Sequence, residues 1–191
     1  VRDGSGLPWT VDAELCEGRA EATIAADAQG TAVTVTWHDA ELAACPPLEI
    51  AGGALAGRAH GVARLRLVSG GPPTGTGDVD LAAGTWQATG PLGALGPLHA
   101  ESASLRWTLR DGQLALDAVQ LRGPEVSASG DGTVELADPL AESVLQLHLA
   151  LAPAPDVRGA LGLLLRLSGD PTATRRLLVG GTLARPSALL Q

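Results

Sequence analysis

The stretch ESASLRWTLRDGQLALDAVQLRG, residues 101–123, decides the fold class of this chain. In its first half apolar residues occupy every second position with polar residues between them, which is the period of a β-strand that has one apolar face. These apolar residues are Leu105, Trp107 and Leu109. The dipeptide Asp111-Gly112 follows and is typical of the two-residue turn that joins antiparallel strands. The stretch therefore predicts a β-hairpin.

The alternation continues after the turn and recurs further along the chain. Leu114 and Leu116 resume it, and its phase slips between Asp117 and Val119, where we expect a β-bulge or a bend. Residues 142–153, ESVLQLHLALAP, alternate again, and their leucines define one apolar face. This leucine row consists of Leu145, Leu147, Leu149 and Leu151. Because the chain has no Phe, Tyr or Met with which to fill a core, we expect the row to point into the interior of the sheet.

The rest of the chain has the same short period, punctuated by Gly, Pro and Asp. Five further segments have the length of a strand: WTVDAEL, GRAEATIAAD, GTAVTVTWHD, GVARLRLVS and GDVDLAAGTWQAT. A closing strand is expected over RRLLVGGTLARP, residues 175–186. Short strands in succession with tight turns predict an antiparallel meander. We therefore predict a mainly β fold, a curled and strongly twisted antiparallel sheet, in a single domain over residues 1–191.

One segment breaks this rhythm and predicts a helix. Residues 152–171, APAPDVRGALGLLLRLSGDP, carry prolines before and Gly-Asp-Pro after a leucine-rich run whose apolar residues recur at helical spacing. We expect one short amphipathic helix near residues 156–167, although its two internal glycines weaken it by roughly 1 kcal/mol each. Its Leu161 and Leu164 are expected to pack near the leucine row.

Two glycine-containing motifs indicate either a ligand-binding loop or a requirement of the sheet. GTGDVDLA, residues 75–82, matches GDGTVELA, residues 130–137, and each begins with two closely spaced glycines. A phosphate-binding loop needs its glycines at the start of a helix, whereas a strand-like pattern follows both motifs here. Glycine within a strand permits a bend or a close backbone approach. We predict that Gly130 and Gly132 serve the geometry of the sheet and bind nothing.

The composition argues against several classes of protein. The net charge is −8, whereas a general nucleic-acid binder needs a basic face. No run of about 18 apolar residues occurs, so this sequence is not expected to contain a membrane-spanning helix. The sequence has no Met, from which we expect that an N-terminal segment precedes it in the natural protein.

The two cysteines, Cys16 and Cys45, leave two possibilities open. In an oxidising compartment they would close a loop of about 30 residues, a bridge whose chain-entropy contribution is roughly 3–4 kcal/mol. The alternative is a pair of buried, reduced thiols. We expect the disulfide, because the resemblance described below implies a periplasmic setting.

No arrangement of residues predicts catalysis or metal binding. The four histidines are scattered and have no ligand spacing with one another or with the cysteines. They are His38, His60, His99 and His148. Paired carboxylates in an apolar setting, a Gly-x-Ser-x-Gly motif and a histidine with an obvious nucleophile are all missing from the pattern. We therefore predict a non-enzymatic protein with no catalytic residues, no cofactor and no metal.

The order of these features resembles the type II secretion system protein N (GspN) family. A Gly-x-Gly strand, VSASGDGTVELADP, is followed by an alternating strand, a leucine-rich helix and a closing Gly-Thr-Leu-x-x-Pro at residues 181–186. Upstream, LAGRAHGVARLRLVSGGPPTGTGDVDLAAG, residues 55–84, is similar to the glycine-punctuated strands of that family and of the broader AsmA-like group. The resemblance covers about residues 48–190, and residues 1–47 resemble nothing that we can name.

The resemblance implies a periplasmic accessory component of a Gram-negative secretion machine. Such a protein would be held at the inner membrane by an N-terminal anchor, and its partners would be other type II secretion components. The family has no catalytic residue to carry over. AsmA-like relatives resemble curved sheets with an apolar concave face, associated with lipid transport or envelope assembly.

Two other function classes therefore stay open beside the secretion component. The first is a lipid- or hydrophobe-binding envelope module, which an apolar face left open over more than a few hundred Å² would favour. The second is a domain of an unrelated surface protein, such as a β-sandwich adhesin, in which two sheets would pack face to face.

Overall fold

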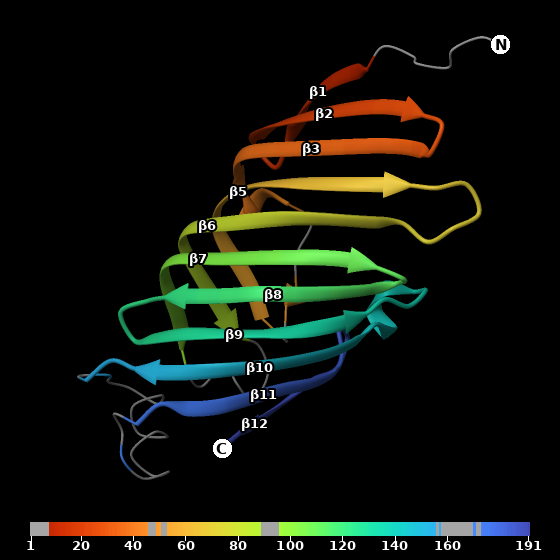
Figure 1. The fold of residues 1–191 in the computed structure, drawn as a ribbon. Helices are drawn as coiled ribbons and strands as arrows, with labels where there is room; N and C mark the ends of the chain where they lie inside the picture. Colours follow the sequence, from red (N-terminus) through yellow and green to blue (C-terminus); the bar gives the residue numbers. More distant parts are fainter. Residues whose placement is uncertain are drawn as a thin grey trace, which may run out of the picture.

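The computed structural model describes residues 8–45, 49–50, 53–88, 96–155, 157, 170 and 173–191. About 75% of these residues lie in strands, and the strands form one antiparallel sheet that does not close on itself (Figure 1). The strands are β1 (Trp9–Leu15), β2 (Gly18–Asp27), β3 (Gly30–Glu41), β4 (Glu49–Ile50), β5 (Gly53–Leu67), β6 (Thr74–Ala88), β7 (Pro97–Arg110), β8 (Gln113–Arg122), β9 (Val126–Glu135), β10 (Val144–Pro153), β11 (Arg175–Thr182) and β12 (Pro186–Leu190).

The strands follow one another across the sheet in chain order, which is the meander that the sequence predicted. The path runs β1-β2-β3-β5-β6-β7-β8-β9-β10-β11-β12, and the short β4 pairs with β5 beside it. Every pairing is antiparallel. The β-sandwich alternative is wrong for the described residues, because a sandwich needs two sheets and these residues form one.

The predicted hairpin and bulge are both confirmed. Asp111 and Gly112 have φ angles of 52° and 76° and connect β7 to β8, as expected for a two-residue turn with two left-handed residues. Further along β8, the pairing with β9 shifts register between Leu116 and Val119. The slip in the sequence alternation near Asp117 therefore corresponds to a real bulge.

The predicted helix is not confirmed. Residues 156–167 lie outside the described residues except for Val157, which is buried and belongs to neither helix nor strand. Leu161 and Leu164 likewise lie outside them. In the described part of the chain the helical elements are two 3-10 turns, η1 (Leu42–Ala44) and η3 (Leu140–Glu142). No helix in this part is long and apolar enough to cross a membrane.

The sheet is curled because its long middle strands turn a corner. In Figure 1, β5, β6 and β7 bend sharply at one side, and part of each runs behind the front of the sheet. The pairing of β5 with β6 shifts register at this bend, where Gly57 has a φ of 132° and Ala83 a φ of 50°. Small residues are found beside this bend: Ala59 and Ala100 are buried, and a Cβ on Gly84 would contact Ala100.

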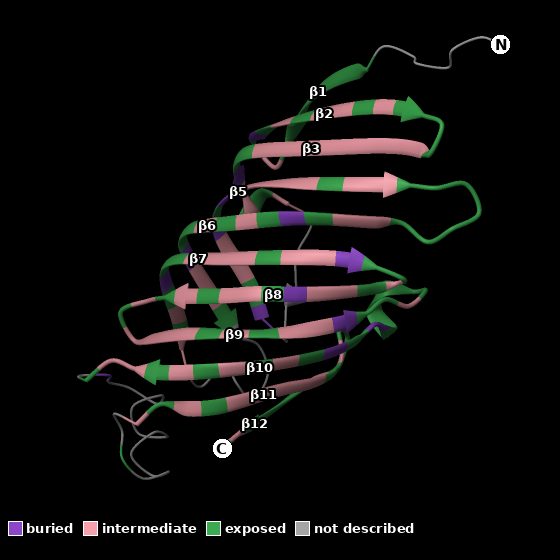
Figure 2. Ribbon diagram, in the orientation of Figure 1, coloured by how far each residue is buried: buried purple, intermediate pink, exposed green. Residues whose placement is uncertain are grey.

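Few of the residues that the structure describes are buried (Figure 2). Its solvent-accessible surface is 12065 Å². A compact monomer of 19.2 kDa is expected to expose roughly 8400 Å². A single-layered sheet is expected to expose more surface than a compact domain, because no second layer of the described chain covers its faces.

A disulfide joins the first hairpin to the end of β3. Cys16 lies in the turn between β1 and β2, Cys45 follows η1, and their Cα atoms are 4.9 Å apart. The amide of Glu41 also donates a hydrogen bond to the carbonyl of Cys16 at 2.8 Å. The pair that sequence reasoning proposed is thus bonded in this structure.

Candidate functional site: the apolar face of the sheet

One face of the sheet is apolar from its first strand to its last. Residues directly opposite each other in an antiparallel pair point to the same face, so the register defines rows that cross the sheet. The central row is Val11, Ala22, Val35, Ala63, Gly77, Trp107, Leu116, Gly132, Leu147, Val179 and Ala188. The rows on either side, which start at Trp9 and Ala13, likewise contain no charged, hydroxyl or amide side chain. We call this surface the apolar face.

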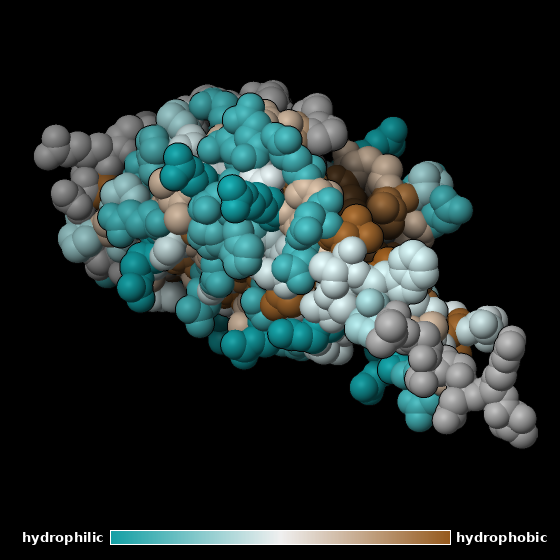
Figure 3. All heavy atoms as spheres, turned by 90° about the horizontal axis from the view of Figure 1, so that it is seen from above, coloured by the Kyte–Doolittle hydropathy of each residue, from teal (hydrophilic) through white to brown (hydrophobic). Residues whose placement is uncertain are grey.

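The opposite face is polar along the same strands. The row that starts at Thr10 illustrates it: Thr10, Thr23, Thr34, Arg64, Thr76, Thr108, Ala115, Thr133, Gln146, Gly180 and Ser187. The whole sheet is therefore amphipathic. Seen from above, apolar side chains gather in a hollow near the upper strands, with hydrophilic side chains around them (Figure 3).

Glycines of the apolar face make room for large neighbours. A Cβ on Gly77 would collide with the ring of Trp107, and a Cβ on Gly61 with the ring of Trp37. Gly132 is the corresponding case in β9, where a Cβ would meet the carbonyl of Gln146 and the side chain of Leu147. The glycines of the two sequence motifs thus accommodate the side chains and backbone of the next strand. This supports the prediction that Gly130 and Gly132 serve the geometry of the sheet. The reason is steric, because a larger residue at either position would collide with the neighbouring strand.

The apolar face is packed at one end of the sheet and open at the other. Leu116, Val134 and Leu145 form a buried cluster. Partly buried residues surround the cluster, namely Leu105, Trp107, Leu114, Val119, Leu147 and Val179. At the β1 end, by contrast, Trp9 is 75% exposed and Val11 is 50% exposed. The described chain therefore presents uncovered apolar side chains along its first strands.

The predicted leucine row lies on the apolar face. Along β10 the leucines are buried or partly buried, whereas the residues between them are exposed. Leu145 is 8% exposed, while Leu147, Leu149 and Leu151 are partly buried. The exposed open end, with Trp9 and Val11, was missed by the sequence analysis. Its signal was present in the alternation of WTVDAEL, which places a tryptophan on the apolar side of a strand.

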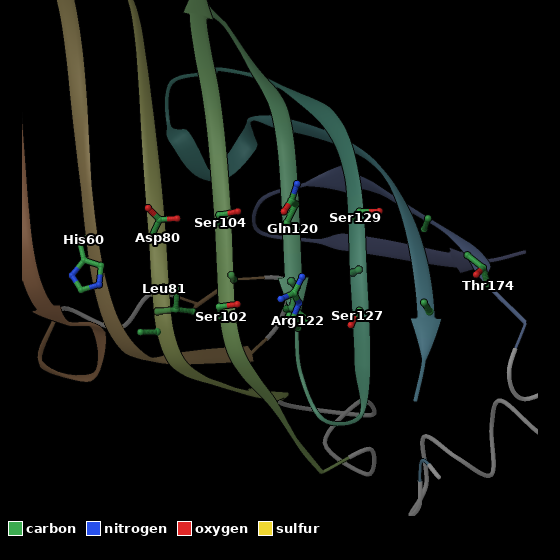
Figure 4. Close-up of a pocket in the computed structure, with 16 residues that line it drawn as sticks. His60, Asp80, Leu81, Ser102, Ser104, Gln120, Arg122, Ser127, Ser129 and Thr174 are labelled. Atoms are coloured by element: carbon green, nitrogen blue, oxygen red, sulfur yellow. The ribbon is translucent and has the colours of Figure 1, made fainter. Parts of the chain in front are cut away.

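A shallow depression of about 760 Å³ lies on the polar face (Figure 4). Serines, an amide and three charged or titratable groups line it, and these three groups are His60, Asp80 and Arg122. His60 Nδ1 accepts a hydrogen bond from the backbone amide of Asp39 at 3.5 Å, and within the described residues no hydrogen bond joins His60 to a serine. The depression thus shows no nucleophile held by a base, and no group of three or more metal-ligating side chains gathers in the described chain.

The shortest ion pair among the described residues ties a turn to a nearby strand. Both carboxylate oxygens of Asp27, at the end of β2, lie 2.6 Å from the Arg66 guanidinium on β5. This hydrogen bond, with a second one from the amide of Gln29, lowers the pKa of Asp27 below its ordinary value of 3.8. A further pair joins His99 Nδ1 to Glu125 at 3.0 Å. Each of these contacts ties a turn to a nearby strand.

No family model, curated protein or solved structure matches this chain. The resemblance to the protein N family therefore rests on the residues of this chain alone, and the amphipathic sheet is the structural feature that bears on function.

Proposed function

We propose that this chain is a non-enzymatic, periplasmic accessory component of a type II secretion system that acts as an open amphipathic scaffold. The resemblance of residues 48–190 to the protein N family supports the assignment to secretion. The apolar face supports the scaffold role, because three adjacent rows cross all eleven strands of the path without a polar side chain. A surface of that kind is suited to an apolar partner.

The secretion role is tested in the bacterium that carries the gene. Deleting the gene should leave substrates of the type II pathway in the periplasm, and the intact gene supplied in trans should restore their export. A second complementing gene with Leu147→Glu, which places a charge in the packed part of the apolar face, should fail to restore it. Unchanged export in the deletion strain would refute the secretion role.

A lipid- or hydrophobe-binding envelope module, as in the AsmA-like group, is the second candidate. The observation that favours it is the exposure of Trp9 and Val11 at the open end of the apolar face. This module should take up a fluorescent fatty acid with quenching of the tryptophans, and Val11→Glu should weaken uptake. The matched control, Thr10→Glu, places the same charge on the polar face of the same strand. Equal uptake by both variants would count against a site on the apolar face.

A further inference from the structure

The two edges of the sheet differ in how well they are protected. Open strand edges expose unpaired backbone groups, and proteins commonly blunt them with short strands, prolines, lysines or bulges. The edge strand β12 has five residues and begins with Pro186. The edge strand β1 has seven residues, all of them exposed, with neither proline nor glycine and no shift in its register with β2. In the described chain β1 pairs on one side only.

The turn that follows β1 determines which of its backbone groups point outward. Cys16 and Glu17 form a two-residue turn with φ angles of 49° and 64°, so the flanking Leu15 and Gly18 make a hydrogen-bonded pair. Hydrogen-bonded and non-hydrogen-bonded pairs alternate from there along the ladder. The backbone N–H and C=O groups of the even-numbered residues therefore point away from β2, and these residues are Thr10, Asp12 and Glu14.

The same residues give the open edge an acidic character. Asp12 and Glu14 lie on the polar face of β1, beside Glu21 and Arg19 of β2, which leaves an excess of negative charge. In the described chain neither Asp12 nor Glu14 has an ion-pair or hydrogen-bond partner. On the other side of the strand, Trp9 and Val11 offer exposed apolar surface.

We propose that β1 binds an extended segment of another protein, which adds a strand to this edge of the sheet. The segment alternates apolar residues, which extend the apolar face beside Trp9 and Val11, with arginines or lysines opposite Asp12 and Glu14. Main-chain hydrogen bonds supply affinity in this mode, and the alternate side chains supply selectivity. Opposite charges that face each other across a strand pair stabilise it, whereas like charges oppose it.

A second copy of β1 fits this edge less well than a basic segment does. If two copies of β1 paired antiparallel over their whole length, the two Asp12 carboxylates would lie directly opposite each other.

Strand addition at β1 goes beyond the proposed function, because it depends on the backbone edge and its acidic side chains and needs neither secretion nor lipid binding.

The test uses a short fluorescent peptide in which valine and arginine alternate, measured by fluorescence anisotropy. We expect saturable binding that weakens as salt is raised. Thr10→Pro removes one outward N–H group and should weaken binding about tenfold, whereas Thr10→Val keeps that group and should not. The double variant Asp12→Asn, Glu14→Gln should also bind about tenfold more weakly. Asp12→Lys with Glu14→Lys should instead prefer a peptide of alternating valine and glutamate.

Peptide controls keep the proposal falsifiable even if Thr10→Pro disturbs the fold. A peptide with N-methyl groups on the amides that face β1 should lose binding to the unmodified protein, while methyl groups on the other amides should not matter. Equal binding of a peptide with the same residues in scrambled order would overturn the proposal. Self-association that Thr10→Pro abolishes, without binding of the peptide, would overturn it in favour of a second copy. Binding to phospholipid vesicles but not to the peptide would overturn it in favour of a membrane surface.

Discussion

At the scale of single residues, glycine has a steric role in this sheet. The motifs of residues 75–82 and 130–137 lie on β6 and β9, which run in opposite directions because three antiparallel pairings separate them. The shared pattern meets the same local need in both strands, which is space beside a large side chain on the next strand.

Replacing Gly132 with alanine should therefore destabilise the protein. The added Cβ would meet the carbonyl of Gln146 and the side chain of Leu147, so we expect the free energy of unfolding to fall by about 1–3 kcal/mol. Gly180→Ala is the matched control, since a Cβ there would have the carbonyl of Leu145 at an ordinary 3.8 Å. Urea denaturation of both variants measures the difference. Equal stabilities would contradict the steric explanation.

The ion pair of Asp27 with Arg66 gives a prediction about pH. Because the folded-state pKa of Asp27 is lowered, the unfolded chain takes up its proton first as the pH falls. The stability that the pair contributes is present above the unfolded pKa and is lost as the pH falls through the folded pKa. An NMR titration of the Asp27 carboxyl carbon should give a midpoint below 3.8, and Arg66→Gln should raise it. A midpoint that Arg66→Gln leaves unchanged would show that the pair does not form in solution.

At the scale of elements, most strands were predictable and the corner was not. WTVDAEL and GRAEATIAAD are the whole of β1 and β2, because alternation and turn residues mark both ends. The predicted closing strand, residues 175–186, contains the whole of β11 but only the first residue of β12, which was not predicted. The corner in β5 and β6 involves the positive φ angles of Gly57 and Ala83, and beside it Gly84 of β6 pairs with Ala100 of β7. Alanines and glycines distant in sequence carry no signal that they will meet, so their role emerged only in the fold.

Truncating side chains of the leucine row should lower the free energy of unfolding more than truncating a side chain on the opposite face of β10. Leu145→Ala should lower the free energy of unfolding by about 3 kcal/mol, and Leu147→Ala by about 2 kcal/mol because Leu147 is only partly buried. Gln146→Ala, between them on the exposed face, should change it by less than about 0.5 kcal/mol. Thermal melts of the three variants compare them. If Leu147→Ala matched Gln146→Ala, the row would be a surface rather than a core.

The disulfide should be needed to hold the first hairpin against the sheet. Replacing Cys16 and Cys45 together with serine frees a loop of sequence separation 29 and should lower the free energy of unfolding by roughly 3 kcal/mol. Thiol titration of the unmodified protein under denaturing, non-reducing conditions should find no reactive thiol. Two reactive thiols in protein isolated from an oxidising compartment would argue against both the bridge and the periplasmic assignment.

At the scale of the whole molecule, the sequence predicted which residues form the apolar face better than it predicted how much of that face is covered by other segments. Period-two alternation determines which residues share the apolar face, so its composition could be predicted strand by strand. How much of that face is open depends on which segments fold over it, and such contacts between distant segments have no periodic signature. Trp9 shows the limit, because it belongs to an apolar row and is nevertheless 75% exposed.

The open sheet should also be visible in solution. A compact domain of 191 residues has an expected radius of gyration of about 16 Å. Small-angle X-ray scattering of the monomer should give a clearly larger value, since the accessible surface of 12065 Å² exceeds that of a compact chain. Light scattering on the same sample verifies the monomer. A radius at the compact value would show that the apolar face is covered in solution.

The meander has a consequence for how such a protein can change over evolutionary time. In the described chain each strand on the main path pairs with its neighbours along that path, and β5 also pairs with the short β4 that precedes it, so no connection crosses another. A gene duplication or deletion that adds or removes one hairpin would lengthen or shorten the sheet by two strands and leave every other connection as it was. Relatives of this chain should therefore vary in length in steps of one hairpin, each with its own share of apolar surface, while the alternation within each strand is retained.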